Sequence, residues 1–536
     1  MIVSKPKTTV NKLGAQVQAS LSPQKILVIG QKIASGSSVA GVVEKGVGES
    51  DIADKFGTKS MLGAQLRSVF KIFKDSGSLA LPQVDVLPLE DVLAGVKAFN
   101  SITITEIGGS TGLATKAGRI KIILGSKKKH TYTVDISVGQ AILTGAGSIS
   151  EVIAGLINDD PYSLLTSVNV SGVITNTFVN KGTVGNATNI KIEGLSYDGT
   201  QYVLGNVKFV ITAFASGATD PTVTSILNAV GKTRYQTIVA PKQYGTTYLT
   251  DFLDARWNVD NAILDGVSIV KMTATYADTL SALGSLNSKS LVAVCDELVD
   301  SAMHKGSAIV EYDFSVSAIL GAIRALRLTD GANISRITPA SDSASADAVG
   351  GVPIATLPYF NTPLFDIAVL DDDIGFDDQT EVPNIISAGG TIIGNDISGN
   401  TVLLGDVVTT YKTDVSGNPD PSFKFLNYVD ALSAGVEYQF VNIKKDFKQH
   451  RLTQGNVKNR RAMVNITTFN ATLVRYFTHL QALLIAPDSP DVTKAYKANI
   501  SSVADYINGK ITSDNQLSIV TQLREVLVNT KMSFEI

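Results

Sequence analysis

The chain has 536 residues, of which 44% are hydrophobic and 18% are charged, and its formal net charge is −3. This length exceeds what a single hydrophobic core accommodates, so we expect several domains. The near-neutral charge excludes a strongly basic nucleic-acid-binding protein, and the hydrophobic content excludes a disordered chain. The single cysteine, Cys295, has no partner for an internal disulfide, so the fold does not depend on an oxidising compartment.

Residues 1–24 are predicted to form an extended N-terminal arm. Val17, Ala19 and Leu21 alternate with polar residues, which is the two-residue period of a strand. The start of the chain lacks the apolar segment of a signal peptide, and no apolar run is long enough to span a bilayer. We therefore expect a soluble protein that is made in the cytoplasm and does not insert into membranes.

Residues 25–100 have the pattern of the first part of an α/β core. The apolar run Lys25–Gly30 predicts a buried strand. A short helix that ends before Gly57 and an amphipathic helix from Met61 are expected to follow it. A strand followed by helices is typical of the beginning of an α/β layer.

Residues 101–215 predict a β-rich domain inserted into this core. Short strands with alternating polar and apolar residues are separated by turns rich in Gly, Lys and Asn. One helix interrupts them, and Ser148 with Glu151 forms a capping box at its start. The core pattern of apolar strands and helical stretches returns over residues 216–405, with a surface loop expected at 341–350.

Residues 406–520 are predicted to form a C-terminal α+β domain. Two strands flank the turn VSGNPDPS, and a basic loop and a helix from Ile466 to Ala486 follow. Residues 521–536 are predicted to form a second arm with the period of a strand. Its alternating apolar residues are Met532, Phe534 and Ile536.

The predicted fold class is therefore α/β and β multidomain. It consists of an α/β core with an inserted β-rich domain, a C-terminal α+β domain and extended N- and C-terminal arms.

Three segments resemble catalytic or binding motifs, but their context does not fit. Gly108–Gly112 matches G-x-S-x-G, yet a strand follows where a nucleophile elbow requires a helix, so we expect a turn. Gly30–Ser37 lacks both the spacing and the lysine of a phosphate loop. Asp371–Asp378 lacks the spacing of a calcium loop, and no His/Cys cluster has metal-ligand spacing. We expect no catalytic, cofactor or metal site, and no enzyme.

Two other features point to assembly. The strand-like chain ends have unpaired edges, which pack on their own domain or pair with another chain. A basic stretch near residue 450 contains one acid, and such a stretch is either a solvated face or a docking surface for an acidic partner. Its basic residues are Lys444, Lys445, Lys448, Arg451, Lys458, Arg460 and Arg461.

Four segments resemble one known family, and they occur in the same order. They are KILVIGQK with ESDIADKFGTKSMLGAQLRSVFK, NKGTVGNATNIKI, DVVTTYKTDVSGNPDPSFKFLNYVDAL with DFKQHRLTQG, and QLREVLVNTKMSFEI. Together they resemble the tail sheath proteins of contractile-tailed phages, in particular those of Mu-like phages. Residues 331–400 depart from the pattern of this family.

The resemblance implies a structural subunit that polymerises as stacked hexameric rings around a tail tube. The sheath contracts to drive the tube through the host envelope, and it contacts tail tube, baseplate and tail terminator proteins without touching nucleic acid directly. Assembly in the host cytoplasm and a place in the virion are implied as well. In the family, the arms add strands to a neighbour's sheet and the C-terminal domain faces the tube, whereas the inserted domain faces outward. The resemblance thus makes the arm residues Val17, Ala19, Leu21, Met532, Phe534 and Ile536 candidate intersubunit strands, and the basic stretch a candidate tube contact.

Two alternatives remain open from the sequence. A sheath of a related bacterial injection machine, a tailocin, has the same pattern, and neighbouring genes distinguish it from a phage sheath. An α/β hydrolase with an inserted β domain is a protein of another class, and it would remain a small oligomer where a sheath forms long polymers. A surface adhesin is disfavoured because no signal peptide is visible.

Overall fold

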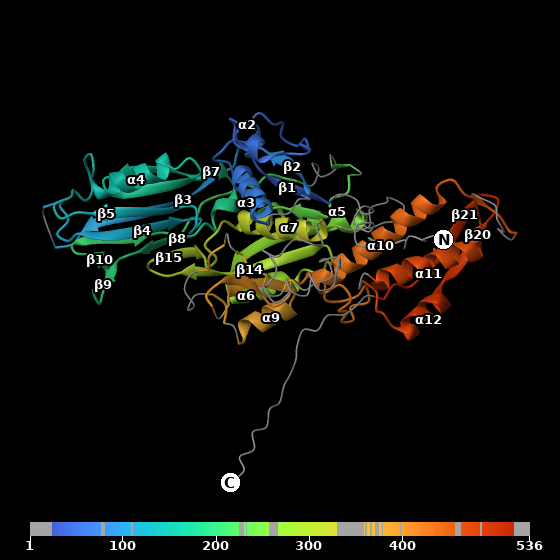
Figure 1. Ribbon diagram of the computed structural model, residues 1–536. Coiled ribbons are helices and arrows are strands. Elements are labelled where there is room, and N and C mark those ends of the chain that lie inside the picture. The colour runs from blue at the N-terminus through green and yellow to red at the C-terminus, as the bar shows by residue number, and fades with distance from the viewer. Residues whose placement is uncertain are drawn as a thin grey trace, which may run out of the picture. The chain divides into compact units, whose positions relative to one another are not determined.

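The structure is a computed structural model (Figure 1). It describes residues 24–518 except for 77–80, 109–110, 224–229, 232, 257–265, 330–358, 360–361, 365–366, 370–374, 378, 397, 456–461 and 483–484. The described residues form two compact units, one between residues 24 and 426 and one between 427 and 518. Apart from Gln24, the two predicted arms lie outside the described residues, and so does the loop predicted at 341–350.

Six strands of the first unit form a parallel core sheet. In spatial order they are β2 (Gln83–Leu89), β1 (Lys25–Gln31), β12 (Thr237–Val239), β13 (Val267–Ala274), β14 (Leu291–Asp300) and β16 (Gly390–Asn395). The short strand β17 (Thr401–Leu404) pairs antiparallel with β16. The predicted buried strand is confirmed, because residues 26–31 of β1 are all buried. Burial on both faces is expected of a parallel strand that lies between layers of helices.

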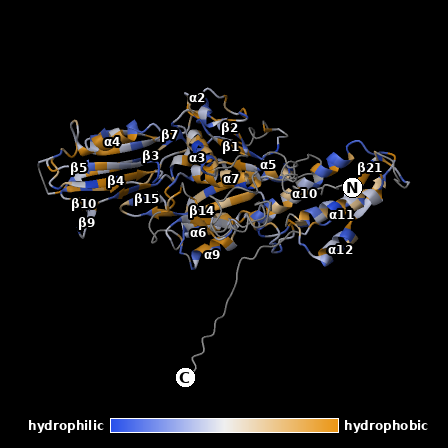
Figure 2. Ribbon diagram, viewed as in Figure 1, coloured by the Kyte–Doolittle hydropathy of each residue, from blue (hydrophilic) through white to orange (hydrophobic). Residues whose placement is uncertain are grey.

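Helices cover both faces of the core sheet. On one face, α3 (Met61–Ser76) packs against α7 (Asp313–Thr329). On the other face, α6 (Tyr276–Gly284) and α9 (Glu381–Ser387) contribute Leu283 and Ile385 to a cluster with Cys295 of β14. The strand β14 and the helix α7 are largely orange in Figure 2, as their burial requires. The predicted short helix is α2 (Ile52–Phe56), which ends at Gly57 with a φ of +86°.

The same sheet continues past the core as an antiparallel extension. The second half of β14 pairs with β15 (His304–Ser307), and β8 (Ile190–Glu193), β4 (Gly118–Leu124) and β5 (Thr131–Ile136) follow in order. The extension is therefore joined to the core through one long strand, β14.

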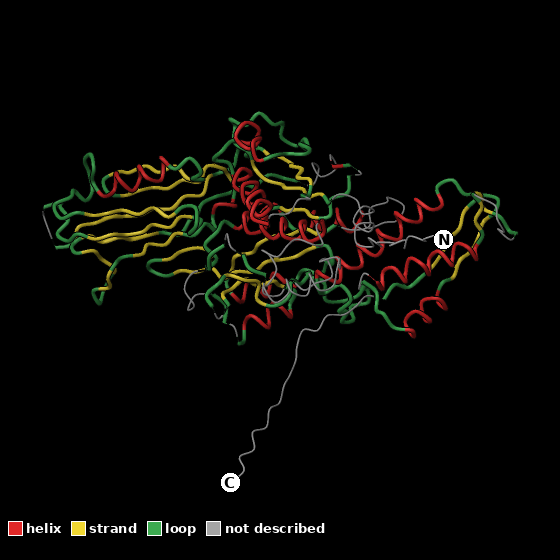
Figure 3. The backbone as a smooth tube through the Cα atoms, in the orientation of Figure 1, coloured by secondary structure: helices red, strands yellow, loops and turns green. Residues whose placement is uncertain are grey.

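A second, six-stranded sheet completes the β-rich region (Figure 3). Its order is β6 (Leu165–Val170), β7 (Val173–Lys181), β3 (Lys97–Glu106), β11 (Val207–Ile211), β10 (Tyr202–Leu204) and β9 (Ser196–Tyr197). Ile102 of this sheet and Ile122 of the extension lie in one buried cluster. The helix α4 (Ile149–Asp159) packs on β5 and β6. One half of the predicted capping box is confirmed, because the Ser148 side chain accepts a hydrogen bond from the Glu151 amide at 3.4 Å. The other half is not formed: the Glu151 carboxylate accepts from Asn169 at 2.8 Å, and the Ser148 amide donates to the Gly145 carbonyl at 3.0 Å.

The second unit consists of helices and short strands. Its elements are α10 (Leu426–Phe447), β18 (Arg451–Leu452), β19 (Met463–Val464), α11 (Ile466–Ala482), α12 (Pro490–Asn499), β20 (Ser501–Asp505) and β21 (Lys510–Asp514). The rings of Phe477 in α11 and Tyr496 in α12 stack with centroids 4.0 Å apart. Together the two units confirm the predicted fold class of an α/β core, a β-rich region and a C-terminal α+β part; the arms are outside the described residues.

The region around the VSGNPDPS turn differs from the prediction. Two flanking strands are expected, but the structure has only isolated pairs there, including one between Thr413 and Pro419. Prolines supply no N–H to a strand ladder, and the Asp414 carboxylate instead accepts the amides of Ser416 and Asn418 at 2.8 and 2.9 Å. Residues 406–426, which the sequence places in the last domain, lie in the first unit.

Two helices of the second unit also differ from the prediction. The predicted basic loop begins inside α10, so Lys444 and Lys445 occupy the last turn of a helix. The helix predicted over Ile466–Ala486 is described over Ile466–Ala482, and Ile485 and Ala486 no longer belong to it.

The close approach of Gly125 to Tyr312 yields a prediction about stability. Gly125 has a φ of +76°, and a Cβ added to it would lie 2.1 Å from the Tyr312 ring. Gly139 has a similar φ of +81° with open space around it. Gly139→Ala is expected to lower the free energy of unfolding by about 1–2 kcal/mol through backbone strain alone. Gly125→Ala is expected to lower the free energy of unfolding by a further amount of about 1–3 kcal/mol, because the added methyl group overpacks against Tyr312. Equal losses for the two variants in denaturant unfolding of the unassembled chain would contradict this packing.

Candidate functional site

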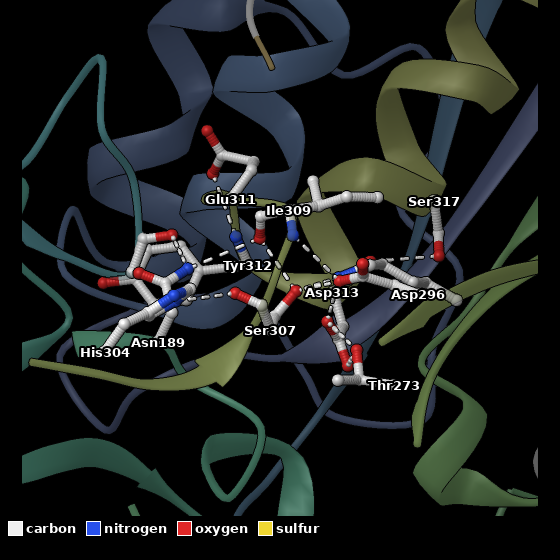
Figure 4. Close-up of polar contacts among 12 residues, drawn as sticks. Asn189, Thr273, Asp296, His304, Ser307, Ile309, Glu311, Tyr312, Asp313 and Ser317 are labelled. Atoms are coloured by element: carbon white, nitrogen blue, oxygen red, sulfur yellow. Dashed lines mark hydrogen bonds and ion pairs between the residues drawn. The ribbon is translucent and has the colours of Figure 1, made fainter. Parts of the chain in front are cut away.

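A cluster of charged and hydroxyl side chains lies where β14 leaves the core sheet (Figure 4). The Lys271 Nζ atom in β13 lies 2.6 Å from an Asp313 carboxylate oxygen at the start of α7 and 3.0 Å from one of Asp296 in β14. Ser307 of β15 donates to Asp296, and the Thr273 hydroxyl donates to Asp313 at 3.0 Å. We call these five residues the Lys271 cluster; they join two strands of the core, one strand of the extension and one helix.

The Lys271 cluster is buried and charged. Burial alone would lower the pKa of Lys271, but the carboxylates of Asp296 and Asp313 outweigh burial and raise it, so the amine is a cation at neutral pH. Burial raises the pKa of Asp313 even though Lys271 opposes that shift. The Ser307 hydroxyl is 2.6 Å from Lys271, but a lysine held as a cation is not available as a base for a serine nucleophile. We therefore assign the cluster a structural role.

Four of the seven predicted basic contact residues are described and exposed. Lys444 and Lys445 end α10, Lys448 follows in the next turn, and Arg451 begins β18. Cations near a helix C-terminus are stabilised by the helix dipole. The other three, Lys458, Arg460 and Arg461, lie outside the described residues.

The one acid of the basic stretch is engaged within the second unit. The Asp446 carboxylate accepts hydrogen bonds from Arg475 at 2.5 Å and from the Tyr476 hydroxyl at 2.7 Å, and both belong to α11. These residues line a hollow of about 540 Å³ between α10 and α11, where Tyr438 stacks on His479 at 5.2 Å. Among the described residues, Asp446 therefore pairs with Arg475 of α11 and not with the exposed lysines beside it.

The hairpin β20–β21 is a small sheet whose two outer edges pair with no other described strand. Among the described residues the two strands pair only with each other. The five residue pairs begin with Ser501 opposite Asp514 and end with Asp505 opposite Lys510. One face is fixed to α11 by a hydrogen bond of 2.6 Å from Ser502 to Asn470. On the other face, Val503 is 69% exposed. A two-stranded sheet of this kind is marginally stable by itself, so it benefits from an added strand.

The candidate arm residues have no position in the described part of the chain. They are Val17, Ala19, Leu21, Met532, Phe534 and Ile536. Their role as intersubunit strands remains a prediction.

The segments rejected as catalytic motifs can be compared with the structure in part. Gly108–Gly112 lies between β3 and β4, so a strand follows it as predicted, although Gly109 and Ser110 are outside the described residues. Cys295 is buried in β14, and burial raises the pKa of its thiol to about 12. Within the described ranges, no three His, Cys, Asp or Glu side chains are grouped to hold a metal ion. Over the same ranges, no helix has the length and apolarity to cross a membrane.

Neither the Lys271 cluster nor the helix α10 is predicted from the sequence. A signal for the cluster exists, because Lys271 interrupts the apolar run VSIVKMTA and Asp296 ends the run LVAVCD. Charged side chains are almost never fully buried without partners. A charge inside a buried strand therefore predicts a buried ion pair, but not which residues form it.

Comparison with known proteins supports the resemblance seen in the sequence. The chain matches no protein-family model. Over 258 residues it is 27% identical to the Mu-like prophage FluMu tail sheath protein of Haemophilus influenzae, and the match covers 47% of this chain and 48% of that relative. The predicted resemblance to the Mu-like tail sheath proteins is thus confirmed over about half the chain.

Solved structures of other proteins align over nearly the whole chain. Sheath tail proteins of Listeria innocua and Desulfitobacterium hafniense align over 95% and 97% of this chain and 96% and 100% of their own, with 11% and 10% identity and TM-scores of 0.44 and 0.41. A chain of the anti-feeding prophage baseplate aligns over 99% of this chain and 100% of its own, at 10% identity and a TM-score of 0.43.

The Lys271 cluster predicts a large effect of one substitution. Lys271→Met removes the cation and leaves the carboxylates of Asp296 and Asp313 buried without it, so the free energy of unfolding should fall by about 3–5 kcal/mol. The matched control is Lys305→Met, which breaks an ion pair with an Asp300 side chain that is 78% exposed and should cost about 0–1 kcal/mol. Chemical denaturation of the unassembled chain measures both. A loss at Lys271 no larger than the loss at Lys305 would refute the assigned role.

Proposed function

We propose that this chain is the subunit of a contractile tail sheath, which polymerises as stacked hexameric rings around a tail tube and contracts to drive the tube through a host envelope. The single observation that carries the proposal is the 258-residue match to a Mu-like prophage tail sheath protein. The proposed location is the virion, after assembly in the host cytoplasm. The proposed role is structural rather than enzymatic, and the proposed partners are other copies of the chain, the tail tube, the baseplate and the tail terminator.

The exposed hairpin of the second unit supports a mechanism for joining subunits. We assign β20–β21 as the acceptor to which arms of neighbouring subunits add strands, a mode in which main-chain hydrogen bonds supply affinity. Residues 15–21 and 531–536 are the donor segments in this proposal. Two arms per subunit gain from high effective concentration once neighbours are held in a ring, so assembly is cooperative.

The exposed basic residues of the second unit support a contact with the tail tube. The exposed cations Lys444, Lys445, Lys448 and Arg451 form a surface for an acidic partner, since the neighbouring Asp446 is already engaged by Arg475 and Tyr476. In the proposed sheath this partner is the tail tube. The inserted β-rich domain, residues 101–215, is assigned to the outer face.

Removal of the C-terminal arm tests the joining mechanism. A chain that lacks residues 529–536 should remain folded, because these residues lie beyond the last described strand, but it should form tubular polymers far less readily. Electron microscopy gives the polymer yield, and circular dichroism of the unassembled chain verifies the fold. Polymers formed as readily as by the full chain would rule out a role for this arm.

Charge reversal tests the tube contact. The triple variant Lys444→Glu, Lys445→Glu and Lys448→Glu should weaken co-assembly with tail tubes by tenfold or more, since each reversal replaces attraction to an acidic tube by like-charge repulsion. Polymers formed without tubes should remain intact. Co-sedimentation with purified tubes measures the effect. The control reverses Lys494 and Lys497, which are exposed on α12 of the same unit. The tube contact would be refuted if the control variant lost as much tube co-assembly as the triple variant. It would also be refuted if the triple variant lost the polymers formed without tubes to the same extent as those formed with tubes.

A further inference from the structure

The first unit contains a pocket that the proposed function does not use. Its volume is about 340 Å³, which is within the usual range for sites that hold small ligands. Its walls come from α3, from the turn between β4 and β5, and from the first turn of α7. Four basic residues line it: Arg67, Lys71, Lys74 and Lys129.

Two of these four cations are already paired. Lys71 lies 2.6 Å from Asp75, and Lys129 lies 3.3 Å from the buried carboxylate of Glu311. Arg67 and Lys74 form no ion pair with the described residues, and Glu49 is the one further acid in the lining. The lining as a whole therefore carries an excess of positive charge.

Arg67 is the best placed of these cations to bind a ligand. One of its amino groups donates to the Thr58 carbonyl at 2.8 Å, and its guanidinium lies over the Tyr162 ring at 4.9 Å. A guanidinium has five N–H donors in a planar fork that matches a carboxylate or a phosphate. Burial lowers the pKa of Arg67, and the attraction of neighbouring groups offsets this only in part.

Asp160 attracts the Arg67 guanidinium but forms no ion pair with it, because its carboxylate is hydrogen-bonded to other groups. Asp160 accepts hydrogen bonds from His130 at 2.8 Å and from Tyr132 at 2.9 Å. Burial alone would raise the pKa of Asp160, but these bonds and the one from the Tyr162 amide lower it to about 2. The carboxylate of Asp160 is thus hydrogen-bonded to His130 and Tyr132 and is not paired with Arg67.

A second, independent observation points to a missing partner in the same pocket. The hydroxyl of Ser315 lines the pocket in the first turn of α7, the residue is 1% exposed, and its oxygen has no hydrogen-bond partner among the described residues. A buried hydroxyl without a partner is destabilising. An oxyanion in the pocket would accept a hydrogen bond from this hydroxyl, and the amino end of α7 favours a negative charge there.

We propose that this pocket binds an oxyanion, a carboxylate or a phosphate group, through the Arg67 guanidinium and the Ser315 hydroxyl. This chemistry has two possible sources: a small anion from solution, or an Asp or Glu side chain of a second copy of the chain in the polymer. The inference does not depend on the identity of the polymer as a sheath.

Thermal unfolding of the unassembled full chain tests the site, with inorganic phosphate and malonate as probes and sodium chloride at matched ionic strength as the reference. The melting temperature should rise saturably with either probe. The rise should be lost in Arg67→Gln and should require about tenfold more probe in Ser315→Ala, since a hydrogen bond to a charged group is removed. The matched control is Arg119→Gln, an exposed arginine paired with Asp135, which should respond as the unmodified chain does.

Polymer formation distinguishes the two sources. If phosphate binds in the melting assay and polymers form equally with and without it, the ligand is an anion from solution. If phosphate inhibits polymer formation by the unmodified chain, and Arg67→Gln forms polymers poorly with or without phosphate, the ligand is a carboxylate of a second copy. The proposal is overturned if Arg67→Gln keeps the full melting shift, or if neither probe shifts the unmodified chain and Arg67→Gln assembles normally.

Discussion

The architecture of the first unit depends on one buried cation held between two carboxylates. Lys271 sits where the parallel core gives way to the antiparallel extension, and Asp296 and Asp313 approach it from β14 and from α7. Its position matters because β14 changes neighbours at this point: it pairs with β13 and β16 before the cluster and with β15 after it. A charge buried this deeply is stable only if the geometry of its partners is kept, so the cluster fixes how the helix and the two parts of the sheet meet.

The sequence is sufficient to predict the elements whose burial follows a simple period. The strand at Lys25–Gly30, the helix from Met61 and the capped helix after Ser148 all carry local signals of apolar spacing or capping, and all three are present. The helix α10 was not predicted, because the basic residues at its end have the composition of a loop. The prediction of two strands around the VSGNPDPS turn was wrong for a local reason. Asp414 accepts hydrogen bonds from the backbone of the turn, and the prolines supply no N–H to a strand ladder.

The candidate sites are less accessible to sequence reasoning, because they depend on contacts between distant residues. A basic stretch is visible in a sequence, but the engagement of Asp446 by Arg475 across 29 positions is not. The same holds for the pocket beside Arg67, whose opposite wall is Ser315, far along the chain. Sequence patterns therefore identify the exposed charges, whereas only the folded chain shows which charges lack a partner.

The continuity of the sheet through β14 has a mechanical consequence. From β2 at one edge to β5 at the other, neighbouring strands are joined by backbone hydrogen bonds without a flexible linker between the core and the extension. A pull directed along the strands loads the hydrogen bonds of each ladder together, and it passes from the extension to the core through the sheet itself. The narrowest ladder on this route joins β15 to β8 by two residue pairs, so it is the first that such a load would separate.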